Sequence, residues 1–208
     1  VAGFLADRDA SIIEAKQFND HLKQRFYMRA VFTAAGPGFP SLDRLRVEFD
    51  SLARPFDMTW QLEDCATRTR ALIAVSRFGH CLQDLLYRWR SGVLPVDIVG
   101  VVSNHEDMRG LVEWNGVPYH YLPVSADNRR EQEAGLLDLF VRQRADLLVL
   151  ARYMQILSTD LCKKLAGRCI NIHHSFLPSF KGARPYHQAH ERGVKIIGAT
   201  AHYGTEGL

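Results

Sequence analysis

The chain has 208 residues and a net charge of +3, with 47% hydrophobic and 24% charged residues. This is the composition of an ordinary globular protein, and it excludes wholesale disorder. The charge is mild and no apolar run reaches the roughly 18 residues of a membrane helix, so we expect neither a nucleic-acid partner nor a membrane partner.

The first part of the chain predicts a small unit with the order α-β-β-α-β. Helical spacing, runs of aromatic and β-branched residues, and a Gly-Pro-Gly turn separate its elements. The order is one strand short of a ferredoxin-like βαββαβ unit. The expected elements are a helix end at 1–9, strands beginning at 10–15 and 25–32, an amphipathic helix at 42–52 and a strand at 56–62.

The remainder alternates strand and helix, with a boundary expected near residues 63–68. Its apolar runs are typical of strands buried on both faces of a parallel sheet. Repeated βα units of this length predict a doubly wound α/β domain with right-handed crossovers. The expected strands are 71–75, 96–102, 146–150 and 169–172, and the expected helices are 82–90, 106–114, 129–144 and 159–166.

Polar residues follow the last of these strands, where an open α/β sheet usually binds its ligand. Asn171 and His173 are two positions apart, so an extended backbone presents both on one face. An amide beside an imidazole can polarise a carbonyl and move a proton, as acyl chemistry requires. Ser175 follows with a hydroxyl, and residues 198–203 resemble a further strand carrying His202 near its end.

Two other interpretations of these polar residues stay open at this point. They can form a simple polar loop whose histidines bond to the backbone. His173, His174 and His202 can also meet around a metal ion, although no carboxylate or cysteine stands beside them at ligand spacing.

The motif Asn171-Ile172-His173, followed by Ser175-Phe176-Leu177-Pro178, resembles the signature of the folate-dependent formyltransferase fold. A second histidine, His174, follows directly after His173. In this feature the chain is similar to the formyltetrahydrofolate deformylases, because the related transferases usually have proline or alanine at that position. Residues 76–82, 179–189 and 198–203 are also similar to the deformylase pattern. The resemblance covers essentially the whole chain.

This resemblance implies two domains. Residues 1–66 are expected to form an N-terminal ferredoxin-like ACT domain, and residues 67–208 a doubly wound parallel-sheet formyltransferase-type catalytic domain. ACT domains often bind small amino acids and often pair, so we expect a small amino-acid effector and a homo-oligomer. The resemblance places the first ACT strand before Val1 and the last part of the catalytic domain after Leu208.

The resemblance also implies the reaction, which is hydrolysis of 10-formyltetrahydrofolate to tetrahydrofolate and formate. Such an enzyme works in the cytoplasm, supplies formate for purine biosynthesis and balances one-carbon pools. No metal or other cofactor is implied, because the folate is the substrate. The implied catalytic residues are Asn171, His173 and His202, and the implied substrate-binding residues are Met154, Gln155, Ile156, Leu157, His174 and Ser175.

Two expectations about this site depend on how the chain continues and packs. The family's catalytic aspartate would fall immediately after Leu208, so a chain that ends there is expected to bind folate poorly and turn over slowly. The segment 154–157 has an alternative interpretation, in which Met154 and Ile156 pack into the core.

Alternatives for the whole protein come from other classes. A formyltransferase with a small amine acceptor is the nearest, but the loop after the first catalytic strand has one glycine, Gly79, and the bulky Phe78. Such a loop does not cradle a phosphate closely. A second alternative is an ACT sensor whose catalytic half has decayed, which the three retained site residues disfavour. A nicotinamide oxidoreductase would need a GxGxxG turn, which the sequence lacks.

Overall fold

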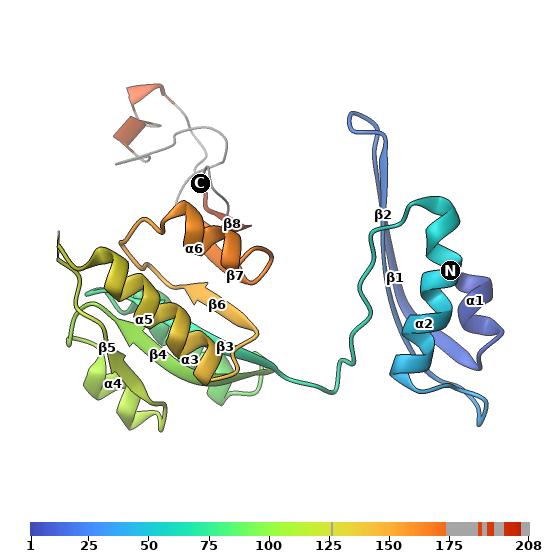
Figure 1. Ribbon diagram of the computed structural model, residues 1–208, viewed down its shortest axis with the longest axis horizontal. Coiled ribbons are helices and arrows are strands. Elements are labelled where there is room, and N and C mark those ends of the chain that lie inside the picture. The colour runs from blue at the N-terminus through green and yellow to red at the C-terminus, as the bar shows by residue number, and fades with distance from the viewer. Residues whose placement is uncertain (126, 174–186, 189–190, 194–197, 205–208) are drawn as a thin grey trace. The chain divides into compact units, whose positions relative to one another are not determined.

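The fold is taken from a computed structural model of the chain. It describes residues 1–125, 127–173, 187–188, 191–193 and 198–204. The chain divides into two compact units, Val1–Thr67 and Arg68–Leu208. Each unit has its own secondary structure and its own packing, and each is described by itself (Figure 1).

The first unit is an antiparallel hairpin with helices before and after it. The hairpin strands β1 and β2 pair from Ala10 opposite Ala34 to Asp20 opposite Arg25. The elements are α1 (Ala2–Ala6), β1 (Ala10–Asp20), β2 (Arg25–Ala34), α2 (Leu42–Ala53) and a short 3-10 turn η1 (Arg54–Phe56). The helix α2 begins where the side chain of Ser41 accepts a hydrogen bond from the amide of Arg44, as an N-cap does.

Aromatic contacts hold the helices of this unit together. The ring of Phe49 on α2 meets Phe4 at 5.2 Å and Trp60 at 5.0 Å between centroids, both edge to face. Arg8 lies over the Phe4 ring at 3.7 Å and also pairs with Glu48 at 2.5 Å. These contacts bury only a few side chains completely, so the unit has a small core.

The strand predicted at residues 56–62 is wrong. Pro55 lies in the 3-10 turn, and Asp57 takes a left-handed backbone with φ +50°. The chain that follows is not a strand, and its backbone is held from α2 instead. The guanidinium of Arg46 donates to the carbonyl of Leu62 at 3.0 and 3.3 Å, while Trp60 packs on α2.

Within the described residues, the second unit is built on a six-stranded sheet with the order β5-β4-β3-β6-β7-β8. All neighbouring pairs are parallel except β7 and β8, which are antiparallel. The mostly parallel sheet confirms the predicted α/β class, whereas β5 was not predicted and β8 departs from a fully parallel sheet. The strands are β3 (Thr69–Val75), β4 (Val96–Ser103), β5 (Tyr119–Tyr121), β6 (Leu147–Leu150), β7 (Cys169–His173) and β8 (Thr200–Tyr203).

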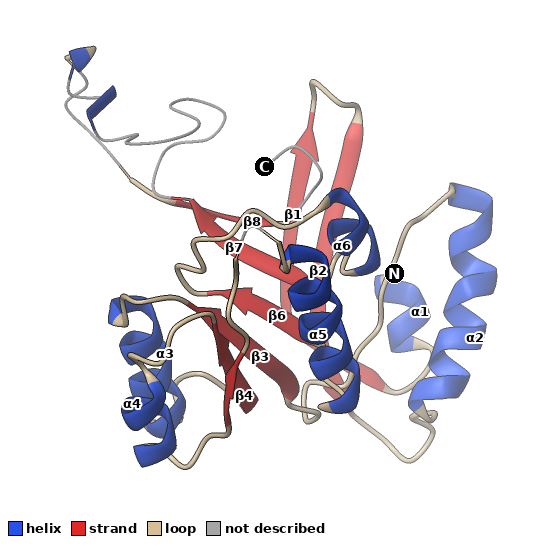
Figure 2. Cartoon of the chain, turned by 60° about the vertical axis from the view of Figure 1, so that its left-hand side comes forward, coloured by secondary structure: helices blue, strands red, loops and turns tan. Residues whose placement is uncertain are grey.

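Helices cover both faces of this sheet, and the alternation along β3 shows which face each helix covers. Leu72 and Ala74 join the cluster under α5 and α6, whereas Ile73 and Val75 join the cluster under α3 and α4. Figure 2 shows α5 and α6 over one face. The helices are α3 (His80–Arg90), α4 (Arg109–Trp114), α5 (Arg129–Arg142) and α6 (Thr159–Lys164).

A bulge in β4 keeps its apolar residues aligned with both clusters. The register with β3 shifts, so that Ala71 pairs with Ile98 while Leu72, the next residue, pairs with Gly100. The extra residue restores the inward orientation of Val101 beyond the bulge, where it is fully buried. Among the described residues, no helix is both long enough and apolar enough to span a membrane.

We expect Val101→Ala to lower the free energy of unfolding of the second unit by about 2 kcal/mol, through lost burial and the cavity that remains. Urea denaturation followed by circular dichroism measures the change. Val141→Ala is the matched control, because Val141 is 65% exposed on α5 of the same unit. Equal effects of the two substitutions would contradict the assignment of Val101 to the core.

Candidate active site

The strand order reverses between β3 and β6, and the site lies where their carboxyl ends meet. The chain runs from β3 outward to β4 and β5, then returns to add β6 on the other side of β3. An open α/β sheet binds its ligands at such a reversal, since the loops on either side of it diverge. The loops after β3 and β6, together with the end of β7, therefore form the candidate site.

The structure brings Asn171 and His202 together as directly opposite residues of β7 and β8. Opposite residues of antiparallel strands share a face of the sheet, with Cβ atoms about 5 Å apart. Cys169, two positions before Asn171 on the same face, is buried against the α5 and α6 cluster. The imidazole of His202 is partly exposed, and its Nδ1 lies 2.9 Å from the carbonyl oxygen of Tyr203.

Other predicted site residues are less fully described. The backbone of His173 continues β7 and pairs with Thr200. His174 and Ser175 lie outside the described residues. The pairing of β7 with β8 thus places two of the three predicted catalytic positions opposite each other, with the third two residues further along the same strand.

The predicted folate-binding segment follows β6 and presents apolar side chains to solvent. Met154 is 59% exposed and Ile156 is 82% exposed, so the alternative in which both pack into the core is wrong. Gln155 is partly exposed, and Leu157 packs at the edge of the α5 and α6 cluster. Phe78 in the loop after β3 is 60% exposed. Exposed apolar side chains beside a strand reversal suit a flat aromatic ligand.

A buried hydrogen-bond network, which the sequence analysis missed, fixes the loops at the reversal. The hydroxyl of Ser76, at the end of β3, donates to Oδ1 of Asn104 at 2.7 Å. The same hydroxyl accepts from the amide of Met154 at 3.2 Å. Ser76 and Asn104 are only 4% and 9% exposed, so both need internal partners. One serine therefore connects the ends of β3 and β4 to the predicted folate-binding segment.

The loop after β3 is filled by side chains. Gly79 is its single glycine, and a Cβ atom added there would collide with the Sδ of Met108. In the same loop, the ring of Phe78 has the guanidinium of Arg152 at 5.4 Å from its centroid. Three bulky side chains thus occupy a loop that, in a phosphate-binding protein, would present open backbone amides.

Buried groups below the site stay neutral at ordinary pH. Burial, reinforced by the neighbouring Cys162, raises the pKa of Cys169 to about 12. Burial likewise raises the pKa of Tyr153, although the side-chain amide of Gln132, which donates to its hydroxyl at 2.6 Å, partly offsets this. The neutral thiol of Cys169, buried at the start of β7, is a packing group and not a nucleophile.

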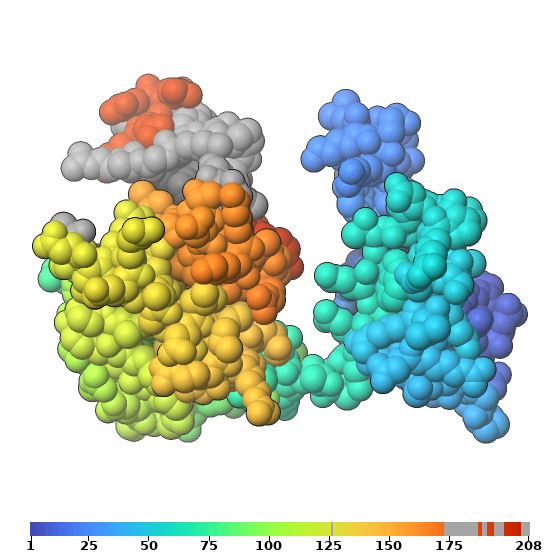
Figure 3. Space-filling model, in the orientation of Figure 1, coloured from blue at the N-terminus to red at the C-terminus, as the bar shows by residue number. Residues whose placement is uncertain are grey.

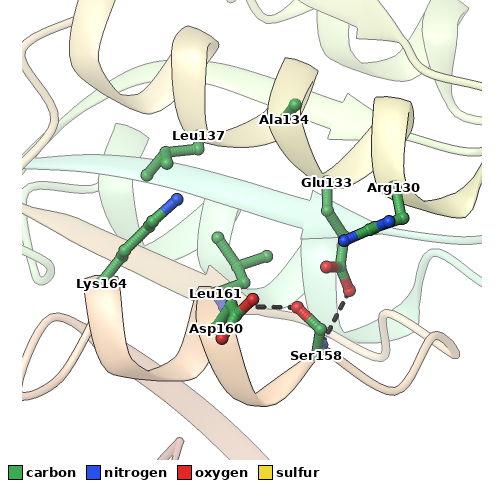
Figure 4. Close-up of a pocket in the computed structure, with 8 residues that line it drawn as sticks. All are labelled: Arg130, Glu133, Ala134, Leu137, Ser158, Asp160, Leu161 and Lys164. Atoms are coloured by element: carbon green, nitrogen blue, oxygen red, sulfur yellow. Dashed lines mark hydrogen bonds between the residues drawn. The ribbon is translucent and has the colours of Figure 1, made fainter.

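A cavity of about 230 Å³ lies between α5 and α6, and none of the predicted site residues is among those that line it. Figure 4 shows the carboxylate of Glu133 meeting Ser158, whose amide donates to it at 2.7 Å. Figure 3 shows α5 and α6, in yellow and orange, side by side on the surface. Two cations and two anions border the cavity, so its lining does not match a pterin ring. The lining residues are Arg130, Glu133, Ala134, Leu137, Ser158, Asp160, Leu161 and Lys164.

Among the side chains that the structure describes, no group of three or more histidine, cysteine, aspartate or glutamate residues is arranged to bind a metal ion. The metal interpretation rests on His173, His174 and His202. The side chain of His173 and the whole of His174 lie outside the described part of the chain, so this interpretation stays a hypothesis.

Comparison with known proteins places this geometry in a family. Residues 69–208 match the formyl transferase family model. A formyltetrahydrofolate deformylase from Corynebacterium sp. (strain P-1) is 55% identical over 98% of this chain and 71% of its own length. The deformylase from Bacillus subtilis (strain 168) is 46% identical over 100% of this chain and 69% of its own.

Solved structures separate the hydrolases from the transferases. The match to the crystal structure of formyltetrahydrofolate deformylase from Burkholderia mallei ATCC 23344 covers 100% of this chain and 73% of that protein's chain. The identity is 50% and the TM-score is 0.87. The chain belongs to the formyltetrahydrofolate deformylase family. The match to the crystal structure of glycinamide ribonucleotide transformylase 1 from Symbiobacterium toebii covers only 72% of this chain and 72% of that protein's chain. The identity is 31% and the TM-score is 0.64.

We expect Ser76→Ala to destabilise the protein by about 1–3 kcal/mol, because it leaves the buried side chain of Asn104 and the partly buried amide of Met154 without their partner. Denaturant titration measures this. Ser91→Ala is the matched control and should change stability by less than about 0.5 kcal/mol, since the Ser91 hydroxyl bonds to the Arg88 carbonyl at an exposed helix end. Similar losses in both variants would show that the Ser76 network is not a stabilising feature.

Proposed function

We propose that this protein hydrolyses 10-formyltetrahydrofolate to tetrahydrofolate and formate. The observation that carries this conclusion is the coverage of the matches. Proteins named formyltetrahydrofolate deformylase align with the whole chain at up to 55% identity, whereas the Symbiobacterium transformylase aligns with 72% of it. The alternative, formyl transfer to a small amine, is not favoured.

The loop after β3 supports water as the acceptor of the formyl group. A transferase needs room for a second substrate beside the reacting carbon. Here Met108 fills the space beside Gly79, and Arg152 lies over Phe78. Water is small enough to react without such a site.

The proposed reaction begins with addition of water to the formyl carbon, which creates a tetrahedral oxyanion. The carbon–nitrogen bond then breaks, the folate nitrogen takes up a proton, and formate leaves. In this proposal the side-chain amide of Asn171 donates to the oxyanion, as an oxyanion-hole donor does. His173 transfers the proton between water and the leaving nitrogen.

His202 lies opposite Asn171 and acts on the same face of the sheet. We assign to its partly exposed imidazole the orientation of the attacking water. The substrate's flat ring system is proposed to lie on Met154, Gln155, Ile156 and Leu157, with His174 and Ser175 completing the contacts. The mechanism uses side chains and water alone, and needs no metal or additional cofactor.

We also propose that residues 1–66 form an ACT-like regulatory domain that binds a small amino acid. The order α1, β1, β2, α2 is that of the middle four elements of a βαββαβ unit. The hairpin exposes aromatic side chains, with Phe18 at 63% and Phe26 at 62%. Exposed aromatics of this kind favour pairing between copies, so a homo-oligomer is part of the proposal.

The cellular role proposed for this reaction is the supply of formate for purine biosynthesis, with a second effect on the balance of one-carbon pools. The site of this role is proposed to be the cytoplasm.

The first test measures formate and tetrahydrofolate release by the full-length protein, with and without an added amine acceptor. We expect the two products in equal amounts and at a rate that does not depend on the amine. Formyl transfer to the amine without free formate would overturn the hydrolase assignment and would mean that the loop after β3 opens to admit an acceptor.

The second test replaces the proposed oxyanion donor. Asn171→Ala in the full-length protein should lower kcat by about 10²–10³-fold with little change in KM, because the lost contact forms in the transition state. Asn19→Ala, an exposed asparagine on β1, is the control for the same chemical change. An unchanged kcat in the Asn171 variant would remove this residue from the mechanism.

A further inference from the structure

The backbone of Arg152 is strained at the edge of the candidate site. Arg152 has φ +60°, a left-handed conformation that side-chain-bearing residues seldom adopt. It comes two residues after Leu150, the last residue of β6. Strained residues of this kind are concentrated at binding and catalytic sites, where the surrounding structure holds a side chain in place for a ligand.

The guanidinium of Arg152 contacts an aromatic ring, and its Nε has no hydrogen-bond partner among the described residues. It stacks on Phe78 at 5.4 Å from the ring centroid, within the range of a cation–π contact. Its Nε atom is buried and forms no hydrogen bond in the structure as described. Arg109 provides the contrast, because its guanidinium donates to both Glu106 and Glu113. An arginine keeps its charge at any physiological pH, so a buried donor without a partner is costly.

The position of Arg152 is level with the proposed reacting centre. Leu150 pairs with Ala74 of β3 on one side and with Asn171 of β7 on the other. The amide of Ala151 still bonds to the carbonyl of Ala74 at 2.8 Å. Arg152 thus emerges between the ends of β3 and β7, at the reversal of strand order.

We propose that Arg152 binds a carboxylate at this edge, through its planar guanidinium supported on Phe78. A guanidinium fork matches the two oxygens of a carboxylate, and an aromatic support fixes its plane. Two carboxylates are available if the proposed function is correct, on which this inference rests. One is formate, the product released beside Asn171, and the other is the glutamate tail of the folate.

The variants for the test are chosen so that folding is preserved. Arg152→Gly removes the guanidinium and places at φ +60° the residue that tolerates this backbone best. Arg144→Gly is the matched control, because Arg144 also has a positive φ of 47° and lies exposed before the opposite end of β6. Arg152→Lys keeps the charge but not the planar fork.

The measurement is a titration of the full-length protein with ¹³C-formate, followed by NMR at constant ionic strength with chloride as the competing anion. For a ligand of three heavy atoms the dissociation constant should be on the order of 1 mM at best. We expect Arg152→Gly to weaken formate binding at least about tenfold, Arg152→Lys to have an intermediate effect, and Arg144→Gly to have none.

A second arm identifies the carboxylate. Binding of tetrahydrofolate is compared with that of tetrahydropteroate, which lacks the glutamate. Loss of formate binding alone in Arg152→Gly assigns the site to formate, and selective weakening of tetrahydrofolate assigns it to the tail. If neither ligand distinguishes Arg152→Gly from Arg144→Gly, the proposal is overturned and Arg152 only packs on Phe78. Both arms measure binding, so their result does not depend on the hydrolysis assay. If the protein showed no hydrolysis, a formate-binding site at Arg152 would still be detectable by NMR.

Discussion

The structure of the second unit depends on the burial of β3 between two neighbouring strands and two layers of helices. Leu72, Ala74 and Val75 have no exposed surface, and their alternating directions give each helix layer its apolar contact. A strand enclosed on all sides cannot slip in register, because a shift by one residue would exchange the two faces. The end of β3 is therefore fixed in position, and the described loops at the site are held relative to it.

Ser76 connects the fixed end of β3 to the segment that is proposed to bind the substrate. It is the first residue after β3, and its hydroxyl bonds both to Asn104 and to the backbone of Met154. The segment that is proposed to hold the substrate is therefore joined to the most deeply buried strand by a partly buried polar contact. A partly buried contact holds its geometry better than a fully exposed one, which precise positioning of a substrate requires.

The sequence allowed most of the catalytic unit to be predicted, because buried parallel strands such as β3 leave uninterrupted apolar runs. It did not reveal β5, whose three residues are too short to show a period, or the antiparallel direction of β8, which depends on pairing across the chain. The stretch after Pro55 has the composition of a strand, but tertiary contacts of Trp60 and Leu62 decide otherwise. The sequence predicts both Asn171 and His202 as site residues, but only the sheet register shows that they are opposite each other.

Arg152 is proposed to contribute to specificity in two ways, by excluding an amine acceptor and by binding a carboxylate. With Phe78 it occupies the loop where a transferase would admit a second substrate, which favours water as the proposed acceptor. Transfer and hydrolysis differ in their second product, since only hydrolysis yields a free carboxylate. A cation whose Nε has no protein partner, placed at the edge where that carboxylate forms, complements the charge of the hydrolytic product. The same side chain can therefore restrict entry of one ligand class and bind another, because an amine acceptor and formate differ in size and in the sign of their charge.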